Sequence, residues 1–355
     1  MPFRIRMGLA AVAALLFMLP THGALAAPPA FDSLVETVLT RHIQPRHARF
    51  AEAADALKTA AAGFCATPDA KRLDAARDAF AAAMDGWQGV QHVAFGPIQQ
   101  FNHSFRIQFW PDSRNTTGRQ LSAMLAERPT GIFEPHGFTF ASVAVQGLPV
   151  VERLIHGDAA AKLLAGGEDA AYRCRLLVAV AGNVAGIARK LDAAWSDEGE
   201  AAVHARAEPQ EAVSSLLTGI DGQLLAMRDR KLLGPLGKSA DRSRPRLAES
   251  WRSGLSLPNL VANLTALQAL YRDTVAPLLA KSDAAFAALL NRAFDATLDS
   301  ARDISAPLKD AVGDPAQRKK VEVLAERLRA LRQLAARDTA KHLGLVIGFN
   351  SQDGD

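Results

Sequence analysis

Hydrophobic residues in this chain recur every three or four positions, the spacing that places them on one face of an α-helix. The clearest stripe covers residues 172–195 and continues for roughly six helical turns. Its apolar positions are Tyr172, Leu176, Val180, Val184, Ile187, Leu191 and Trp195. The alternation of apolar and polar residues that marks strands is not the dominant pattern. The sequence therefore predicts an all-α fold.

Three further helices can be placed from their ends and from proline. Residues 69–92 carry an apolar face at helical spacing. Residues 32–63 predict a first helix, which we expect Pro45 to bend or break because proline lacks a backbone N–H. Asp314 and Pro315 open another helix, since aspartate caps helix N-termini and proline suits the first helical position. Long helices without strands are typical of helical bundles.

The chain is too long for one simple bundle, and the polar stretch 196–210 is the clearest break. We therefore predict two helical-bundle domains, each resembling a four-helix bundle, over residues 27–198 and 199–355. Each half contains a Gly-Pro step followed by an irregular segment with a tryptophan. Their spacings differ, so an ancient duplication stays open. Residues 94–140 form an irregular insertion rich in proline and glycine, and such insertions are more often functional than idle.

The N-terminus has the pattern of an export signal. Two arginines precede the apolar run 7–19, and small residues lead up to Ala26 and Ala27. Residues 1–26 therefore predict a secretory signal peptide cleaved near that pair, and the bacterial pattern favours the periplasm. The apolar run is too short to span a bilayer as a helix, and no later uncharged run is long enough. We expect no transmembrane segment after cleavage.

Charge and cysteine content narrow the class of protein further. The chain has 41 basic and 37 acidic residues, interleaved throughout, so it lacks the basic stripe of a nucleic-acid-binding protein. Cys65 and Cys174 both lie in the predicted exported part, where thiols are oxidised. A disulfide between them is the favoured interpretation, and two buried free thiols are the alternative.

Common hydrolase motifs are absent from the sequence, so only the spacing of its scattered histidines and carboxylates can indicate a site. Glu152 and His156 lie four residues apart, which places them on one face if the helix continues. Such a pair is half of a metal site. The alternative is structural: His156 precedes Gly157, and a histidine in the last helical turn is favoured by the helix dipole. Glu152 then pairs with an arginine, for instance Arg153.

The remaining histidines carry weaker signals. His42 and His47 flank Pro45 at a spacing unsuited to a joint ligand pair, and we expect both at the surface. His92 and His103 lie on either side of a Gly-Pro turn, so they face each other only if that turn folds back.

One loop combines three chemically different side chains. Arg106, Trp110 and Asp112 place a cation, a large ring and a carboxylate before a proline turn. These side chains can form a binding surface. The alternative is a capping loop in which Trp110 is buried and Arg106 pairs with Asp112.

Several stretches together resemble the imelysin-like family of exported bacterial proteins, which is also classed with the M75 peptidases. The resemblance runs across nearly the whole mature chain. It implies an all-helical protein with two bundle domains of four main helices each, working in the periplasm in iron acquisition. The stretches are FGPIQQF (95–101), FRIQFWPD (105–112), GLPVVERLIHG (147–157), YRC (172–174), SLPNLVANLTAL (256–267) and LGLVIGFNSQDGD (343–355).

The family's hallmark motif is GxHxxE, and its histidine and glutamate are the proposed metal ligands. In this chain the glycine is Gly147, the glutamate is Glu152, and Pro149 stands where the histidine belongs. The sequence is similar to the exported, lipoprotein-type branch with GLPxxE. Proline offers a metal no lone pair, so one ligand of the motif is missing. We expect Pro149 to set or bend the first turn of its helix instead.

The resemblance and the missing ligand favour a non-catalytic periplasmic protein that serves iron uptake by binding a ligand or partner in a groove between two bundles. Iron-transport components of the cell envelope are the expected partners. The ligand stays open between a metal ion such as iron, haem, a peptide and a protein. One alternative is a divergent metallopeptidase using Glu152 and His156; another is a purely structural interaction module. The residues expected in the groove are Arg106, Trp110, Asp112, Gly147, Glu152, Asn259 and Asn263.

Overall fold

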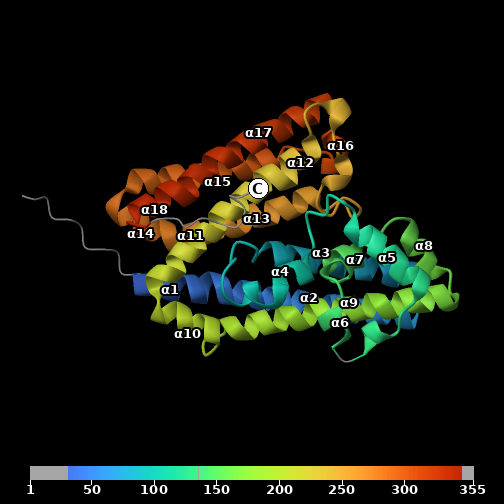
Figure 1. Ribbon diagram of the computed structural model, residues 1–355. Coiled ribbons are helices and arrows are strands. Elements are labelled where there is room, and N and C mark those ends of the chain that lie inside the picture. The colour runs from blue at the N-terminus through green and yellow to red at the C-terminus, as the bar shows by residue number, and fades with distance from the viewer. Residues whose placement is uncertain (1–30, 135, 346–355) are drawn as a thin grey trace, which may run out of the picture.

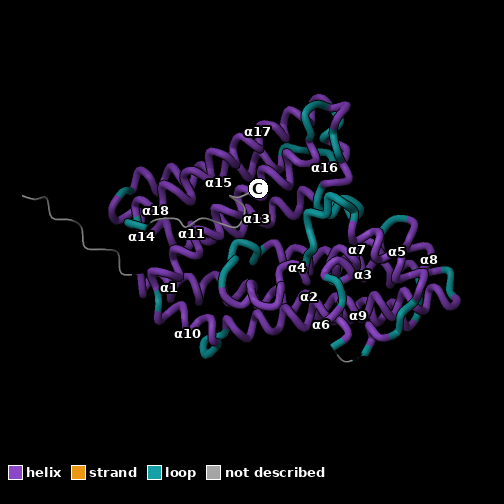
Figure 2. The backbone as a smooth tube through the Cα atoms, viewed as in Figure 1, coloured by secondary structure: helices purple, strands orange, loops and turns teal. Residues whose placement is uncertain are grey.

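The described part of the protein, residues 31–134 and 136–345 of a computed structural model, is helical and contains no strand. Figure 1 shows two stacked layers of helices, one from the N-terminal half and one from the C-terminal half. Figure 2 shows loops both between the layers and at their outer ends. The all-α prediction is confirmed. The predicted signal peptide and most of the C-terminal stretch 343–355 lie outside the described residues.

The first layer is built mainly by α2, α3 and α9, with shorter helices around them (Figure 1). Its elements are α1 (Phe31–Val38), η1 (Leu39–Ile43), α2 (Gln44–Ala66), α3 (Ala70–Gln88), η2 (Gly96–Asn102), α4 (His103–Ile107), α5 (Thr116–Glu127), η3 (Gly131–Phe133), α6 (Gly137–Phe140), η4 (Val143–Val145), α7 (Leu148–Ile155), α8 (Asp158–Leu164), α9 (Gly167–Trp195) and α10 (Glu200–Ala207).

The second layer is built mainly by α11, α13, α15 and α17, and α11 leads into it from the first (Figure 1). Its elements are α11 (Pro209–Ala226), η5 (Met227–Leu233), α12 (Gly234–Leu236), η6 (Ala240–Arg242), η7 (Pro245–Leu247), α13 (Ser256–Leu270), η8 (Tyr271–Val275), α14 (Ala276–Ser282), α15 (Ala284–Arg302), α16 (Leu308–Ala311), α17 (Pro315–Arg332), η9 (Gln333–Asp338) and α18 (Thr339–His342).

Two hydrophobic cores lie within these layers. The N-terminal core is formed chiefly by apolar side chains of α2, α3, α7 and α9. The C-terminal core is formed by α11, α13, α15 and α17, and α1 and Trp195 also pack into it. Apolar residues of the segment 31–43 therefore share a core with the second half, although this segment belongs to the N-terminal half. The predicted domain boundary between residues 198 and 199 stays a prediction.

Three local sequence features explain where helices lie or begin. Every member of the apolar stripe in α9 is buried. Asp314 accepts hydrogen bonds from the backbone N–H groups of Ala316 and Gln317, so it caps α17 as its sequence predicts. A π-helical turn, η1, interrupts the α-helical hydrogen-bond pattern directly before α2, and Pro45 lies in the first turn of α2.

A disulfide joins the two long helices of the N-terminal core. Cys65 in α2 is bonded to Cys174 in α9, with their Cα atoms 5.4 Å apart, which confirms the predicted pairing. One helical stretch, Gly167–Ala207, has the length and composition to cross a membrane. However, 61% of its most apolar window is buried inside the protein, as in the core helix of a bundle, so it is weak evidence for a membrane span.

Candidate functional site

A cavity of about 270 Å³ lies between the two halves of the chain. The N-terminal half contributes the loop 109–113 and one side of α7. The C-terminal half contributes η5 and the irregular segment 244–252. Because both halves supply its walls, the shape of the cavity depends on how the two layers are held together.

Three of the residues predicted from sequence meet in this cavity: Trp110, Asp112 and Glu152. Asp112 accepts hydrogen bonds from the backbone N–H groups of Thr116 and Thr117, at 2.6 and 2.9 Å, and so caps α5. Trp110 is half-buried, and the peptide bond that follows it is cis. The alternative of a fully buried Trp110 is therefore wrong.

Arg106 does not line the cavity. Its guanidinium donates to the carbonyl oxygens of Phe138 and Thr139, the latter at 2.9 Å. The alternative pairing of Arg106 with Asp112 is therefore wrong. Arg106 instead ties the irregular insertion to the end of α4.

Glu152, the glutamate of the hallmark motif, holds the facing loop. Its Oε1 accepts hydrogen bonds from the backbone N–H and the hydroxyl of Ser253, at 2.9 and 2.8 Å. The side chain is buried, and burial raises the pKa of this carboxyl group even though Ser253 and nearby Arg252 oppose the rise. Ser253 follows Trp251 and Arg252, so Glu152 fixes the segment that presents both side chains to the cavity.

His156 points elsewhere. Helix α7 ends at Ile155, and the extended backbone of His156 turns its ring against Phe80, with 5.7 Å between the ring centroids. Burial lowers the pKa of this imidazole to about 4. Glu152 and His156 therefore do not share a helix face. Within residues 31–134 and 136–345, no three His, Cys, Asp or Glu side chains form a group that could hold a metal ion.

Gly147 has a conformational reason to be glycine. Its φ is +78°, and a Cβ atom there would lie 2.3 Å from the carbonyl oxygen of Ile107 and 2.5 Å from that of Arg106. Pro149 lies in the first turn of α7, which confirms its predicted helix-starting role. This stretch of the motif therefore sets where α7 begins and how closely it approaches α4.

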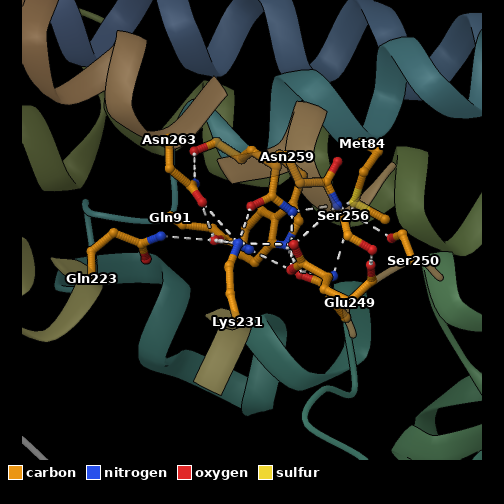
Figure 3. A network of polar contacts seen from close by, with 12 residues as sticks. Met84, Gln91, Gln223, Lys231, Glu249, Ser250, Ser256, Asn259 and Asn263 are labelled. Carbon is orange, nitrogen blue, oxygen red and sulfur yellow. Dashed lines mark hydrogen bonds and ion pairs between the residues drawn. The ribbon is translucent and has the colours of Figure 1, made fainter. Parts of the chain in front are cut away.

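Asn259 and Asn263 lie behind the cavity, in a buried polar network centred on an ion pair. Lys231 Nζ lies 2.9 Å from Glu249 Oε2, and their side chains are 3% and 1% exposed. Lys231 also donates to Gln88 Oε1 at 2.6 Å and to Asn263 Oδ1 at 2.8 Å. Figure 3 shows Glu249 and Asn263 on either side of Lys231 in this network. Burial lowers the pKa of Lys231, and Glu249 opposes that shift.

Glu249 is satisfied as fully as its partner. Its carboxylate accepts hydrogen bonds from Gln88 at 3.2 Å, Gln108 at 2.9 Å and Asn259 at 3.0 Å. Gln108 in turn accepts from Trp87 Nε1 at 2.7 Å. The network connects α3 and its following loop to η5 and α13. It therefore fastens the two layers beside the cavity (Figure 3).

The cavity also contains side chains that the sequence-based interpretation missed. Five arginines line it, against three carboxylates, and Trp251 lies among them. A usable signal was present, because RSRPR at residues 242–246 and the nearby Trp251 form a basic, aromatic segment outside the regular helices. The arginines are Arg153, Arg230, Arg244, Arg246 and Arg252.

The histidines expected at the surface are buried. His42 and His47 are each 2% exposed, so that prediction is wrong. Nε2 of His42 lies 2.7 Å from Nε2 of His92, and Arg46 donates to the other ring nitrogen of His42. His92 therefore contacts His42 rather than His103, whose ring bonds the carbonyl oxygen of Pro97. Burial lowers the pKa of His42 well below its usual value and that of His92 to about 3.

The imelysin family model, which carries the M75 peptidase designation, matches residues 43–335, most of the chain. This chain belongs to the imelysin family. A search of curated proteins finds no match. Two solved structures share the fold of this imelysin-family protein and cover nearly all of it.

The first is an imelysin-like protein from Psychrobacter arcticum 273-4, with a TM-score of 0.76 and 19% identity, covering 90% of this chain and 97% of that one. The second is described as an iron-regulated protein A precursor from Parabacteroides distasonis ATCC 8503, with a TM-score of 0.73 and 16% identity, covering 89% and 97%. At these identities the likeness shows the fold alone. The replacement of the motif histidine by Pro149 therefore has to be judged from this chain's own geometry.

Proposed function

We propose that this imelysin-family protein is exported to the periplasm and serves iron uptake by binding a ligand or a partner, without catalysis, in the cavity between its two halves. One observation carries the proposal: a cavity of about 270 Å³ whose walls come from both halves and include Trp110, Asp112 and Glu152. Clefts between packed units are common sites for small ligands.

The connection to iron comes from kinship. A similar structure belongs to a protein described as an iron-regulated protein A precursor, and the word precursor agrees with the export signal predicted in residues 1–26. Iron-transport components of the cell envelope are accordingly the proposed partners.

Two observations favour binding over peptide hydrolysis. A hydrolytic metal site needs several protein ligands, an open coordination position and a general base. Here Pro149 replaces the motif histidine, and Glu152 accepts two hydrogen bonds from Ser253. Glu152 thus acts in shaping the cavity wall.

The test uses the mature chain, purified without a histidine tag. Thermal-shift titrations with ferric citrate, ferrous iron, haem, zinc and copper are run beside a peptide-cleavage assay. We expect saturable stabilisation by an iron-containing ligand and no peptide turnover. Turnover that disappears in Glu152→Gln overturns the proposal in favour of a metallopeptidase, and the absence of stabilisation by any iron ligand overturns its iron assignment.

A further inference from the structure

Four of the five arginines that line the cavity have no hydrogen-bond or ion-pair partner for their guanidinium groups among the described residues. The side chains of Arg230, Arg244, Arg246 and Arg252 make no hydrogen bond or ion pair within the part of the chain that the structure describes. The guanidinium groups of Arg252 and Arg246 lie over the ring of Trp251, at 4.1 and 5.8 Å from its centroid. These cation–π contacts involve no hydrogen bond, so the N–H donors of both groups stay without an acceptor among the described residues.

Within the described residues, none of the three carboxylates of the cavity forms an ion pair with a lining arginine. Asp112 caps α5, and Glu152 accepts from Ser253. Asp229 lies 2.5 Å from Arg228, which is not one of the lining arginines. Asp112 and Glu152 lie close enough to offset part of the charge of Arg252 and Arg153, but five arginines against three carboxylates leave the cavity lining with an excess of positive charge.

The pKa of Arg252 reflects the charges that surround it. Burial lowers the pKa of Arg252 to about 10; the charges of Arg153 and Arg246 lower it further, and those of Glu152 and Asp112 oppose the shift. A guanidinium with that pKa is still protonated at neutral pH. An anion placed among these groups relieves their mutual repulsion, and a cation increases it.

Size and shape restrict the ligand further. A cavity of 270 Å³ lies just below the range of roughly 300–1,000 Å³ for small-molecule sites, which favours a compact ligand over a peptide. Guanidinium groups are planar forks whose paired N–H donors match the spacing of carboxylate and phosphate oxygens. Several such forks around one cavity suit a ligand with several anionic groups.

We infer that the cavity binds a small polyanion carrying several carboxylate or phosphate groups, and that iron enters it as an anionic chelate and not as a bare cation. The iron part of this inference rests on the proposed function. The polyanion part rests on the arginines and the cavity alone. Bound in this way, iron keeps its coordination shell within the chelate, and the protein needs no metal ligands of its own.

The test is isothermal titration calorimetry with the mature protein. The probes are citrate, ferric citrate, pyrophosphate and a cationic hydroxamate chelate of ferric iron. We expect saturable binding of the first two or of pyrophosphate, with affinity falling as NaCl rises, because salt screens charge-driven contacts. The citrate and pyrophosphate arms tell polycarboxylate from phosphate recognition. The cationic chelate should not bind.

Variants locate the binding. Arg244→Gln and Arg252→Gln should each weaken polyanion binding about tenfold or more, because each removes a charge-assisted hydrogen-bond donor. Arg242→Gln is the matched control: Arg242 lies in the same segment, its side chain is 74% exposed, and it does not line the cavity. It should bind as the unsubstituted protein does. Thermal unfolding checks that all three variants are folded.

Each outcome separates the two proposals. Absence of polyanion binding, or an equal loss in Arg242→Gln, overturns the polyanion inference. Binding of the cationic chelate, unaffected by Arg244→Gln, overturns it too but supports the iron assignment. Binding of citrate and pyrophosphate with exclusion of ferric citrate supports the polyanion site and overturns the iron part.

Discussion

Basic side chains lie in two opposite environments at the junction of the two layers. Lys231 is 3% exposed, and an ion pair and two close hydrogen bonds satisfy its ammonium group. A short distance along the chain, Arg244 and Arg246 are exposed at the cavity, and their side chains have no hydrogen-bond or ion-pair partner within the described residues.

The difference indicates a structural role for Lys231 and a ligand-binding role for the arginines. A buried charge is tolerated only when it is paired and hydrogen-bonded, so the Lys231 network demands one arrangement of the two layers. An exposed arginine stays hydrated, so leaving it unpaired costs little folding free energy and it stays available to bind a ligand. The network fixes the cavity, and the arginines give it its chemistry. Substitutions in the two sets should therefore have separable effects.

Breaking the buried pair should have the largest effect on stability. Glu249→Gln keeps the shape of the side chain but leaves Lys231 buried without its counter-charge. We expect the free energy of unfolding, measured by urea denaturation, to fall by about 3–5 kcal/mol. Asp85→Asn is the control, since it breaks the exposed pair with Arg49 and should cost less than about 1 kcal/mol. Equal losses in the two variants would show that the buried pair matters no more to stability than the exposed one.

Lowering the pH should cause the next largest loss of stability, because the buried histidines are neutral in the folded protein. Burial lowers the pKa of His47 to about 4 and that of His92 to about 3. The unfolded chain therefore binds more protons than the folded one between about pH 6.5 and these values, and stability is lost as the pH falls through that window. Each histidine should cost about 2 kcal/mol by pH 5.

Urea denaturation between pH 7 and 5 measures this loss, before most carboxylates of an unfolded chain take up protons. His47→Asn should flatten the dependence on pH. Replacing the exposed His136 by Asn is the control and should leave the slope unaltered. A stability that stays constant over this range would show that the buried histidines are not held neutral.

A smaller loss should follow from Gly147→Ala, which acts on the cavity wall through the backbone. The new Cβ would lie 2.3 Å from the carbonyl oxygen of Ile107, and the positive φ disfavours alanine, so we expect a loss of about 1–3 kcal/mol. Gly157→Ala is the control, because its φ is +65° and a Cβ there has no neighbour within 4 Å. Its thermal unfolding temperature should fall less; the reverse order would show that the approach of α7 to α4 does not matter.

The arginines should contribute least to stability. Arg244→Gln removes a charge with no protein partner and relieves repulsion among its neighbours, so the free energy of unfolding should stay within about 0.5 kcal/mol of the unsubstituted value. The same variant should lose polyanion affinity. A loss of several kcal/mol in urea denaturation would place Arg244 among the structural residues.

Much of the fold could be predicted because it depends on local patterns. The stripe in α9, the cap at Asp314 and the starting role of Pro149 each follow from residues close together in sequence. The disulfide between Cys65 and Cys174 followed from the predicted export of a chain with only two cysteines.

The site could be predicted only in part, because it is made by residues far apart in sequence. Trp110, Asp112 and Glu152 were found through their motifs. The Lys231–Glu249 pair was missed, since hydropathy places both residues at the surface. His42 was also expected at the surface. Its contact with His92 joins residues far apart in sequence and exists only after folding. The pairing of Glu152 with His156 assumed a helix one residue longer than α7.

Diffraction at the iron absorption edge, from crystals of the mature protein grown with ferric citrate, tests the central claim most directly. The account predicts an anomalous iron peak inside the cavity, with citrate oxygens between the metal and Arg244 or Arg252 and no protein atom in the iron's coordination shell. Iron bound directly by Glu152, with other protein donors completing its shell, would contradict it.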